Sequence, residues 1–282
     1  MAVQSHWFSV GSIVPWARAG VGAVATQANV EASYGPRGLE LMAAGTGAPE
    51  ALASLLKEDP KAEFRQVAMV DWNGRAAAHT GEKCMAAAGH VVGDGFSCQG
   101  NIMESRRVWE SMSRAFRSSA RMPLQDRLMR SLDAGQEGGG DLRGKQSAAM
   151  VVVGPEASPN PWEGKIIDLR VEDSPDPLKE LKRLIGYNVG YNWMNKGDEL
   201  LSSGKLGEAS EAYSAGRRFI PRVLEAKYWV AVGLLISGKD RRKGVRMLKE
   251  VCAEEKNWVQ VTRGLANSGI KIDQSLLREV IP

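Results

Sequence analysis

The chain has 282 residues, of which 43% are hydrophobic and 25% charged, with a formal net charge of +4. This composition is typical of globular proteins and excludes a disordered chain, and the length predicts about two domains. No apolar stretch reaches the ~18 residues that a membrane span needs, and no basic segment precedes a signal-peptide-like run, so we expect a soluble cytoplasmic protein. Its three cysteines cannot form a disulfide framework.

The positive charge lies in the C-terminal part. From Asp176 onward there are 19 Lys and Arg and 13 Asp and Glu, a net charge of +6, and the remainder carries −2. A basic domain can indicate nucleic-acid binding. Because basic and acidic residues are interleaved along predicted helices, without a nucleic-acid-binding motif, a solvated helical face is the favoured interpretation and nucleic acid is not an expected partner.

The pattern of residues 1 to about 173 predicts a mixed α+β domain. His6–Val10 is compatible with a turn or with the continuation of an opening strand. The small and β-branched residues of Gly20–Gln27 predict a buried strand. Apolar residues at helical spacing then predict helices over Gly35–Ala44 and Pro49–Lys57, the second with proline in its first turn.

The next predicted elements alternate between strands and helices. The strongest local signal is the Asn73-Gly74 pair, which is typical of a two-stranded hairpin. In chain order we predict strands Val67–Asp71 and Arg75–Thr80, strands Gly89–Gly93 and Phe96–Gln99, helices Arg106–Ser118 and Leu124–Ala134, and strands Ser147–Val153 and Lys165–Val171.

The segment Asp173–Pro177, rich in Pro and Asp, is the best linker candidate and predicts domains at 1–175 and 176–282. Beyond it, only helices are predicted. Residues from Trp193 to Pro221 have the spacing W-x3-G-x2-L-x8-A-x3-Y-x2-G-x4-P, which resembles one tetratricopeptide repeat, followed by a degraded second copy. Such repeats need a neighbour to bury their core. The repeat-like region could form a peptide-binding groove. We favour the alternative interpretation, in which it is a packing surface or a self-association surface of a homo-oligomer.

Metal and cofactor motifs are not evident. His79, Cys84, His90 and Cys98 do not have the paired spacing of a zinc site, so no metal is expected. The glycine run Gly138–Gly140 is followed by a strand and not by a helix, so it is neither a phosphate loop nor a dinucleotide fingerprint, and no cofactor is expected.

Two polar segments remain as candidate sites. After the glycine run, Asp141 and Arg143 either form a pair that rigidifies the loop, or line a pocket in which Arg143 binds a carboxylate. His6, beside Trp7 and Phe8, is either a base with a pKa lowered by its aromatic neighbours or a hydrogen-bonded structural histidine.

Five separated segments, in the same order, resemble one bacterial and archaeal family, the domain of unknown function numbered ten-twenty-eight, which is assigned to the N-terminal-nucleophile (Ntn) hydrolase superfamily. They are AVQSHWFSVGSIVPWARAGVGAVATQ (2–27), YGPRGLELMAAG (34–45), RQVAMVDWNGRAAAHTG (65–81), AGHVVGDGFSCQGN (88–101) and GGDLRGKQSAAMVVV (139–153). The resemblance implies an α+β fold with an αββα sandwich of two antiparallel sheets between helical layers, followed here by the all-α helical-repeat-like region.

The resemblance also implies a chemistry. In that superfamily an N-terminal Thr, Ser or Cys attacks an amide carbonyl while its own α-amine acts as base. The family places this residue on an opening strand, of the type Thr-Phe-Ser-Ile, before the strand that begins at Ala2, and Ala2 has no nucleophilic atom. Either the recorded start is internal to the gene product, which we favour, or this member folds without that strand and binds without cleaving.

We therefore expect an Ntn-type hydrolase of a small amide that is inactive as written; the alternative is a non-catalytic ligand- or peptide-binding protein. The nucleophile is unknown. The resemblance makes Ser5, His6 and Asn101 the catalytic candidates, with Asn101 as a donor to an oxyanion. It gives seven substrate-binding candidates: Gln27, Thr80, Gln99, Asp141, Arg143, Gln146 and Ser147.

Overall fold

The computed structural model describes residues 1–160, 163–265, 270 and 279–280. The chain forms two compact units, Met1–Ile185 and Gly186–Pro282, and the division falls inside helix α5 (Pro177–Ser202). The reason is apolar packing, because Leu178, Leu181 and Ile185 at the start of α5 are buried in a core of the first unit. The segment predicted as a linker lies just ahead of this helix.

One sheet of the first unit has four antiparallel strands in the order β2-β3-β4-β5. They are β2 (Pro15–Arg18), β3 (Gly22–Ala28), β4 (Arg65–Asp71) and β5 (Ala76–Thr80). Helices α1 (Tyr34–Ala43) and α2 (Ala48–Glu58) cover its outer face. They bury Leu39 and Leu52 against Val24, Val67 and Met69 of the sheet. The predicted hairpin and both predicted helices are confirmed.

A second layer holds two smaller groups of strands, in the orders β1-β8-β9 and β6-β7. They are β1 (Ala2–Ser5), β8 (Ser147–Val153), β9 (Lys165–Val171), β6 (Ala87–Gly93) and β7 (Phe96–Met103). Helix α4 (Leu124–Glu137) buries Met129 and Leu132 against β8 and β9. Helix α3 (Arg107–Ser118) buries Trp109 against β6 and β7.

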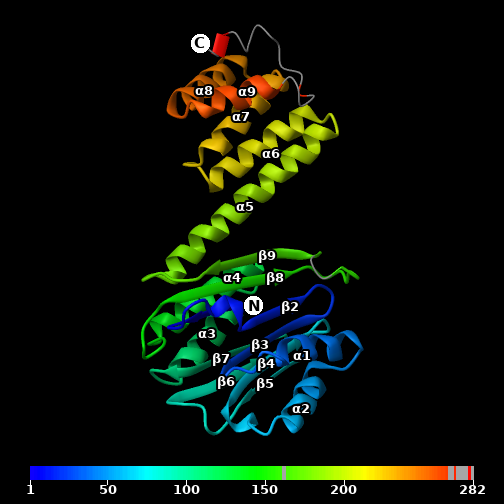
Figure 1. The fold of residues 1–282 in the computed structure, drawn as a ribbon, viewed down its shortest axis with the longest axis vertical. Coiled ribbons are helices and arrows are strands. Elements are labelled where there is room, and N and C mark those ends of the chain that lie inside the picture. Colours follow the sequence, from blue (N-terminus) through cyan, green and yellow to red (C-terminus); the bar gives the residue numbers. More distant parts are fainter. Residues whose placement is uncertain (161–162, 266–269, 271–278, 281–282) are drawn as a thin grey trace. The chain divides into compact units, whose positions relative to one another are not determined.

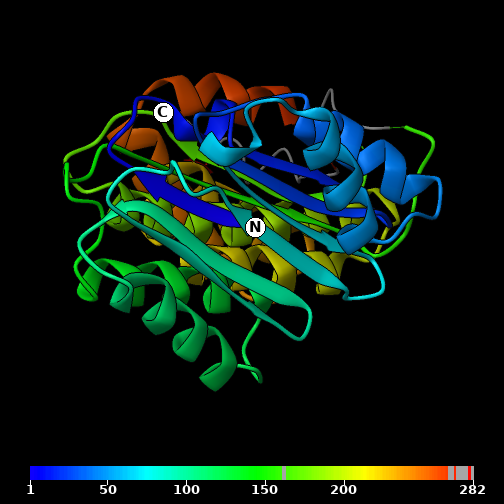
Figure 2. The ribbon, with the colours of Figure 1, turned by 90° about the horizontal axis from the view of Figure 1, so that it is seen from below.

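The two layers of strands pack face to face. Val3 and Ala149 of one layer meet Ala25 and Ala68 of the other in a small core between them. Figures 1 and 2 show α1 and α2 on one side of the strands and α3 and α4 on the other. The order of layers is therefore helix, sheet, sheet, helix, and the predicted α+β sandwich is confirmed.

Short connections complete the unit. His6–Val10 forms a turn that leads into a 3-10 helix, Val10–Ser12 (η1), and is not a continuation of the strand. Ser9 begins that helix with a φ of 56°, a left-handed conformation that reverses the chain. A second 3-10 helix, Ala62–Phe64 (η2), precedes β4.

The second unit is helical: the rest of α5, α6 (Leu206–Phe219), α7 (Leu224–Ile236), α8 (Arg241–Glu254) and α9 (Asn257–Gly264). Gly197 lets α5 approach the ring of Tyr213 in α6, and Gly216 lies against the carbonyl oxygen of Gly190. Gly197 and Gly216 are the two glycines of the repeat-like spacing that begins at Trp193. Within the described part of the chain, no helix combines the length and apolar character needed to cross a membrane.

Candidate functional site

A hollow of the first unit lies between two unpaired strand edges. β1 is the terminal strand of the order β1-β8-β9, and β6 is the only strand with which β7 pairs among the described residues. At its end, Met103 of β7 forms an isolated bridge with Asp141. A cavity of about 700 Å³ separates these two edges, and residues of both strands line it. Its other walls come from the opposite sheet, from α3 and α4, and from the loops around Cys84 and Asp141.

The Gly140–Leu142 loop closes one end of this gap. The N–H of Glu104, just after β7, donates to the Gly140 carbonyl (3.1 Å), and the N–H of Leu142 donates to the Ile102 carbonyl (3.0 Å). The N–H of His6, just after β1, donates to Oδ2 of Asp141 (3.3 Å). Both strands therefore end beside Asp141, and their chains run in the same direction along the gap.

Asp141 and Arg143 form a two-pronged ion pair at this closed end. Nε of Arg143 lies 3.0 Å from Oδ1 of Asp141, and Nη2 lies 2.7 Å from Oδ2. Burial raises the pKa of Asp141, but the hydrogen bonds from Arg143 and from the His6 N–H outweigh it, so the pKa lies below its usual value. Both residues line the cavity, so the pair both fixes the loop and forms part of the wall.

A row of side-chain amides occupies the interior of the cavity. Asn101 and Gln99 of β7 and Gln27 of β3 all line it. Nδ2 of Asn101 donates to Oε1 of Gln66 (3.1 Å), a fully buried residue of β4, and Oε1 of Gln99 accepts from the Ser97 hydroxyl (2.9 Å). Asn101 keeps one amide hydrogen that can bind a ligand oxygen.

Two further glutamines, which the sequence did not predict as site residues, also line the cavity. Among the described residues, Nε2 of Gln4 in β1 and Oε1 of Gln136 in α4 are buried without a hydrogen-bond partner. A buried polar atom without a partner costs about 1–3 kcal/mol, so such atoms mark a place where a donor or acceptor from elsewhere fits. No local sequence signal identifies them, because their proximity arises only when β1 packs against α4.

Six of the predicted site residues line the cavity: Ser5, Gln27, Gln99, Asn101, Asp141 and Arg143. The other four lie outside the cavity lining, and most of them form hydrogen bonds that hold the surrounding segments together. Ser147 is fully buried, accepts from the Val10 N–H (3.0 Å) and donates to the Trp7 carbonyl. The Gln146 N–H donates to the Ser5 carbonyl (3.0 Å).

Thr80 and His6 complete this second group. The Thr80 hydroxyl lies 2.8 Å from Nδ1 of His90 and accepts from Nε2 of Gln66 (3.0 Å), which ties β5 to β6. Burial, followed by the charge of His79, lowers the pKa of His90. The His6 side chain is exposed, so its aromatic neighbours do not enclose it.

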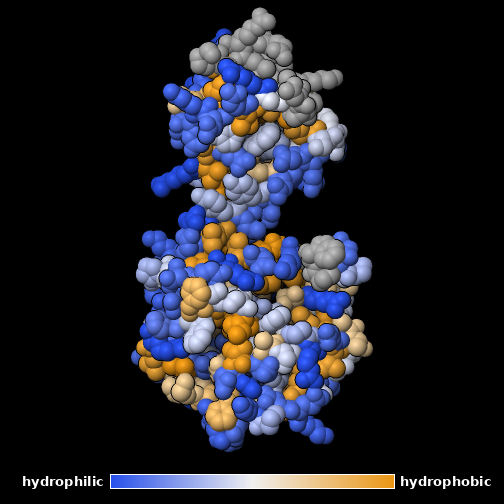
Figure 3. Space-filling model, viewed as in Figure 1, coloured by the Kyte–Doolittle hydropathy of each residue, from blue (hydrophilic) through white to orange (hydrophobic). Residues whose placement is uncertain are grey.

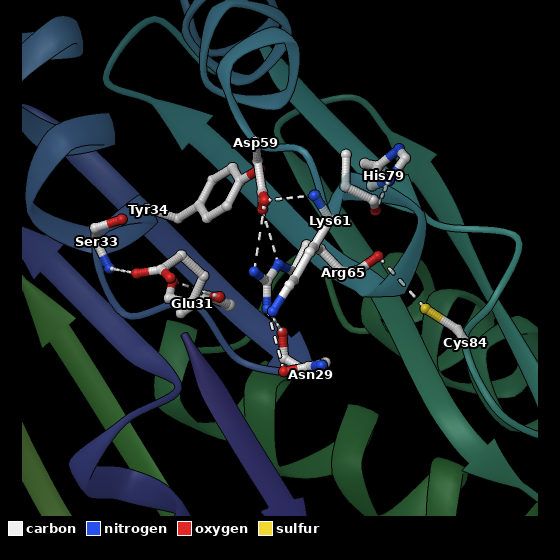
Figure 4. Close-up of polar contacts among 11 residues, drawn as sticks. Asn29, Glu31, Ser33, Tyr34, Asp59, Lys61, Arg65, His79 and Cys84 are labelled. Atoms are coloured by element: carbon white, nitrogen blue, oxygen red, sulfur yellow. Dashed lines mark hydrogen bonds and ion pairs between the residues drawn. The ribbon is translucent and has the colours of Figure 1, made fainter.

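A buried ion pair between Asp59 and Arg65 anchors residues that line another part of the cavity (Figure 4). Nε of Arg65 donates to Oδ2 of Asp59 (2.8 Å), and this bond lowers the pKa of Asp59 below its usual value. Nη1 of Arg65 donates to the carbonyl oxygen of Asn29 (2.6 Å), and the Cys84 thiol lies 3.4 Å from the Arg65 carbonyl. Asn29 and Cys84 both line the cavity. Burial raises the pKa of Cys84, so its thiol stays protonated at neutral pH.

The N-terminal amine lies at the other end of β1, away from Asp141. It donates to the carbonyl oxygen of Val151 (2.5 Å), and burial lowers its pKa to about 5. Neither Met1 nor Ala2 has a hydroxyl or thiol to combine with that amine.

Comparisons with known proteins agree on one family. A model described as a family of unknown function, DUF1028, matches residues 1–181. The crystal structure of protein SPO2555 from Silicibacter pomeroyi, a DUF1028 protein, is similar: 27% identical, with a TM-score of 0.58 over 65% of this chain and 77% of that chain. None of the curated proteins matches.

Proposed function

Because the chain belongs to the DUF1028 family, we propose that the cavity between β1 and β7 is the site of an amide hydrolase of the N-terminal-nucleophile type. The supporting observation is the pair of unpaired strand edges facing one cavity. An additional extended segment fits between them and joins the strands of this layer into one sheet. That segment is the element that would supply a Thr, Ser or Cys with a free amine.

The direction of the two strands favours one place for the nucleophile. β1 and β7 both end beside Asp141, and a segment antiparallel to both would begin there. Its first residue would then lie at the Asp141 end of the gap, where Ser5, Asn101 and the Asp141–Arg143 pair line the cavity. Ser5, Asn101 and the Asp141–Arg143 pair thus support a reaction at the closed end of the gap.

Each group there has a chemically suitable task. The free α-amine of the inserted segment takes the proton from its own hydroxyl as the oxygen attacks the amide carbonyl. It then gives that proton to the departing amine as the C–N bond breaks, and water hydrolyses the ester that remains. The remaining amide hydrogen of Asn101 donates to the developing oxyanion, a contact typically worth about 3 kcal/mol. Because the Arg143 guanidinium is already paired with Asp141, we assign it to positioning the loop.

Peptide complementation tests this function. Thr-Phe-Ser-Ile amide is added to the full chain, binding is measured calorimetrically, and ammonia or amine release is followed over a panel of small amides. We expect hydrolysis only with the free Thr peptide; Ala-Phe-Ser-Ile amide and the N-acetylated Thr peptide should bind without turnover. Absence of binding by all three peptides would contradict the proposal.

A second candidate is a binding protein that does not cleave, favoured by the unpaired Nε2 of Gln4 and Oε1 of Gln136. A donor on β1 and an acceptor on α4, both lining the cavity, match the two polar ends of an amide. In the same experiment this function predicts binding of small amides to the chain without hydrolysis, whichever peptide is present.

A further inference from the structure

Another free strand edge lies in the first unit, away from the cavity. β9 ends the order β1-β8-β9, and no strand among the described residues pairs with its outer edge. Its pairing with β8 is regular from Val171 to Ile167 and irregular only near Lys165. An unpaired edge leaves N–H and C=O groups free to pair with another chain.

The two faces of β9 differ in chemistry. Ile167 and Val171 are 3% and 6% exposed and pack in the core with α4 and α5, and Leu169 is half-buried beside them. Asp168 and Arg170 alternate with them and are exposed. In Figure 3, polar and apolar side chains lie next to one another in the band where Figure 1 draws β9.

We propose that this edge binds the same edge of a second copy of the chain, antiparallel, with Leu169 opposite Leu169. In this register Asp168 of each copy lies opposite Arg170 of the other, and Ile167 lies opposite Val171. Directly opposed residues lie on the same face of the sheet. The apolar face of one copy therefore continues into the apolar face of the other, and the charged face gains two pairs of opposite charge. The β1-β8-β9 sheets of both copies join into one.

The charges select this register among its neighbours. A two-fold axis at Asp168 places the two Asp168 carboxylates opposite each other, and an axis at Arg170 does the same for the two guanidinium groups. Like charges directly opposite each other are destabilising. Charges that only prevent aggregation at a strand edge need not be complementary to a second copy of the same edge. The features of β9 that hinder edge pairing are Lys165 and the irregular pairing beside it, and both lie at one end of the strand.

Arg170 is available for a partner. Within its own strand, Oδ2 of Asp168 is bound by Nζ of Lys165 at 2.7 Å, whereas Nε of Arg170 lies 3.9 Å from Oδ1. The Arg170 side chain is 43% exposed. An opposite carboxylate therefore gives it a closer partner than its own strand does.

Sedimentation velocity of the full chain over a range of concentrations tests the proposal, with D168R, R170D and the D168R/R170D double variant. We expect a dimer for the unchanged chain. For each single variant we expect the dissociation constant of the dimer to be at least about tenfold larger, because two pairs of opposite charge, related by the two-fold axis, become two pairs of like charge. The double variant should recover the dimer. Circular dichroism of each single variant controls for folding.

Three results would overturn the proposal. One is a monomer for the unchanged chain at its highest soluble concentration. Another is a dimer that both single variants leave intact, which would assign association to another surface such as the helical unit. The third is a double variant that stays as dissociated as the singles while its circular dichroism is native.

Discussion

Nδ2 of Asn101 lies 3.1 Å from Oε1 of Gln66, so a cavity residue of β7 is oriented by a buried residue of β4 in the opposite layer. Gln66 also donates to the carbonyl oxygens of Gly100 (2.8 Å) and Gly89 (3.2 Å) through Nε2. One side chain therefore links the two strand layers directly behind the candidate site.

Replacing Gln66 with Leu should reduce the free energy of unfolding by about 2–4 kcal/mol, because several buried groups lose their partner together. Urea denaturation measures this loss. Gln27, which lies opposite Gln66 in β3 and lines the cavity, is the matched control. Q27L should cost less than half as much, and an equal cost for both variants would contradict the central role of Gln66.

Replacing Arg143 with Ala should destabilise the protein by about 1–3 kcal/mol, a range reduced for the partial exposure of Arg143. Hydrogen bonds from Arg143 hold the pKa of Asp141 down, so this stabilisation is present above the pKa of an unfolded Asp and is lost as pH falls through the folded pKa. Without Arg143 that pKa rises, so acid unfolding should begin at a higher pH.

Acid titration followed by circular dichroism measures this shift. Arg37, whose ion pair with Glu58 is exposed, is the control. R37A should leave the acid midpoint unchanged, and an R143A midpoint equal to that of the unchanged chain would contradict the assigned role of the Asp141–Arg143 pair.

His90 should make stability fall in mild acid. Its pKa in the folded state is lowered by burial and by His79, so the folded protein binds fewer protons than the unfolded chain below a pH of about 6.5. Thermal unfolding at a pH of about 7.5 and about 5.5 should therefore show a smaller acid-induced loss for H90Q than for the unchanged chain. H6Q, at an exposed histidine, should keep the full loss; equal losses for H90Q and H6Q would contradict the prediction.

A methyl group at Gly197 should disrupt the crossing of α5 and α6. Its Cβ would lie 2.3 Å from Cε1 of Tyr213, and overpacking of this kind costs about 1–3 kcal/mol. G264A is the matched control, since a Cβ there would meet no described atom within 4 Å beyond its chain neighbours and its own helix backbone. Calorimetry should show a lower unfolding temperature for G197A only. A neutral G197A would show that the two helices can move apart without loss.

The sequence predicted those elements whose signal is local. Ser147–Val153 and Lys165–Val171 were predicted with the bounds that the structure shows, and Asn73-Gly74 does join β4 to β5. The gap between β1 and β7 could not be predicted in this way. Its walls come from segments far apart in the chain, and alternation along a strand does not reveal which edge remains unpaired.

The same reason explains the mixed outcome at the site. Asp141 and Asn101 line the cavity, whereas Thr80 and Ser147 stabilise the framework behind it. A polar residue type at a strand end is compatible with both roles. Gln136 was missed because a glutamine on a helix carries no signal until the packing of α4 leaves its oxygen without a partner.

Hydrogen exchange of the backbone amides, with and without Thr-Phe-Ser-Ile amide, tests the central claim that the gap accepts an extended segment. A bound strand forms hydrogen bonds with both edges, so protection should increase together in Ala2–Ser5 and in Ser97–Asn101, and β5 should not change. Protection confined to one of these strands, or located outside the first unit, would contradict the account.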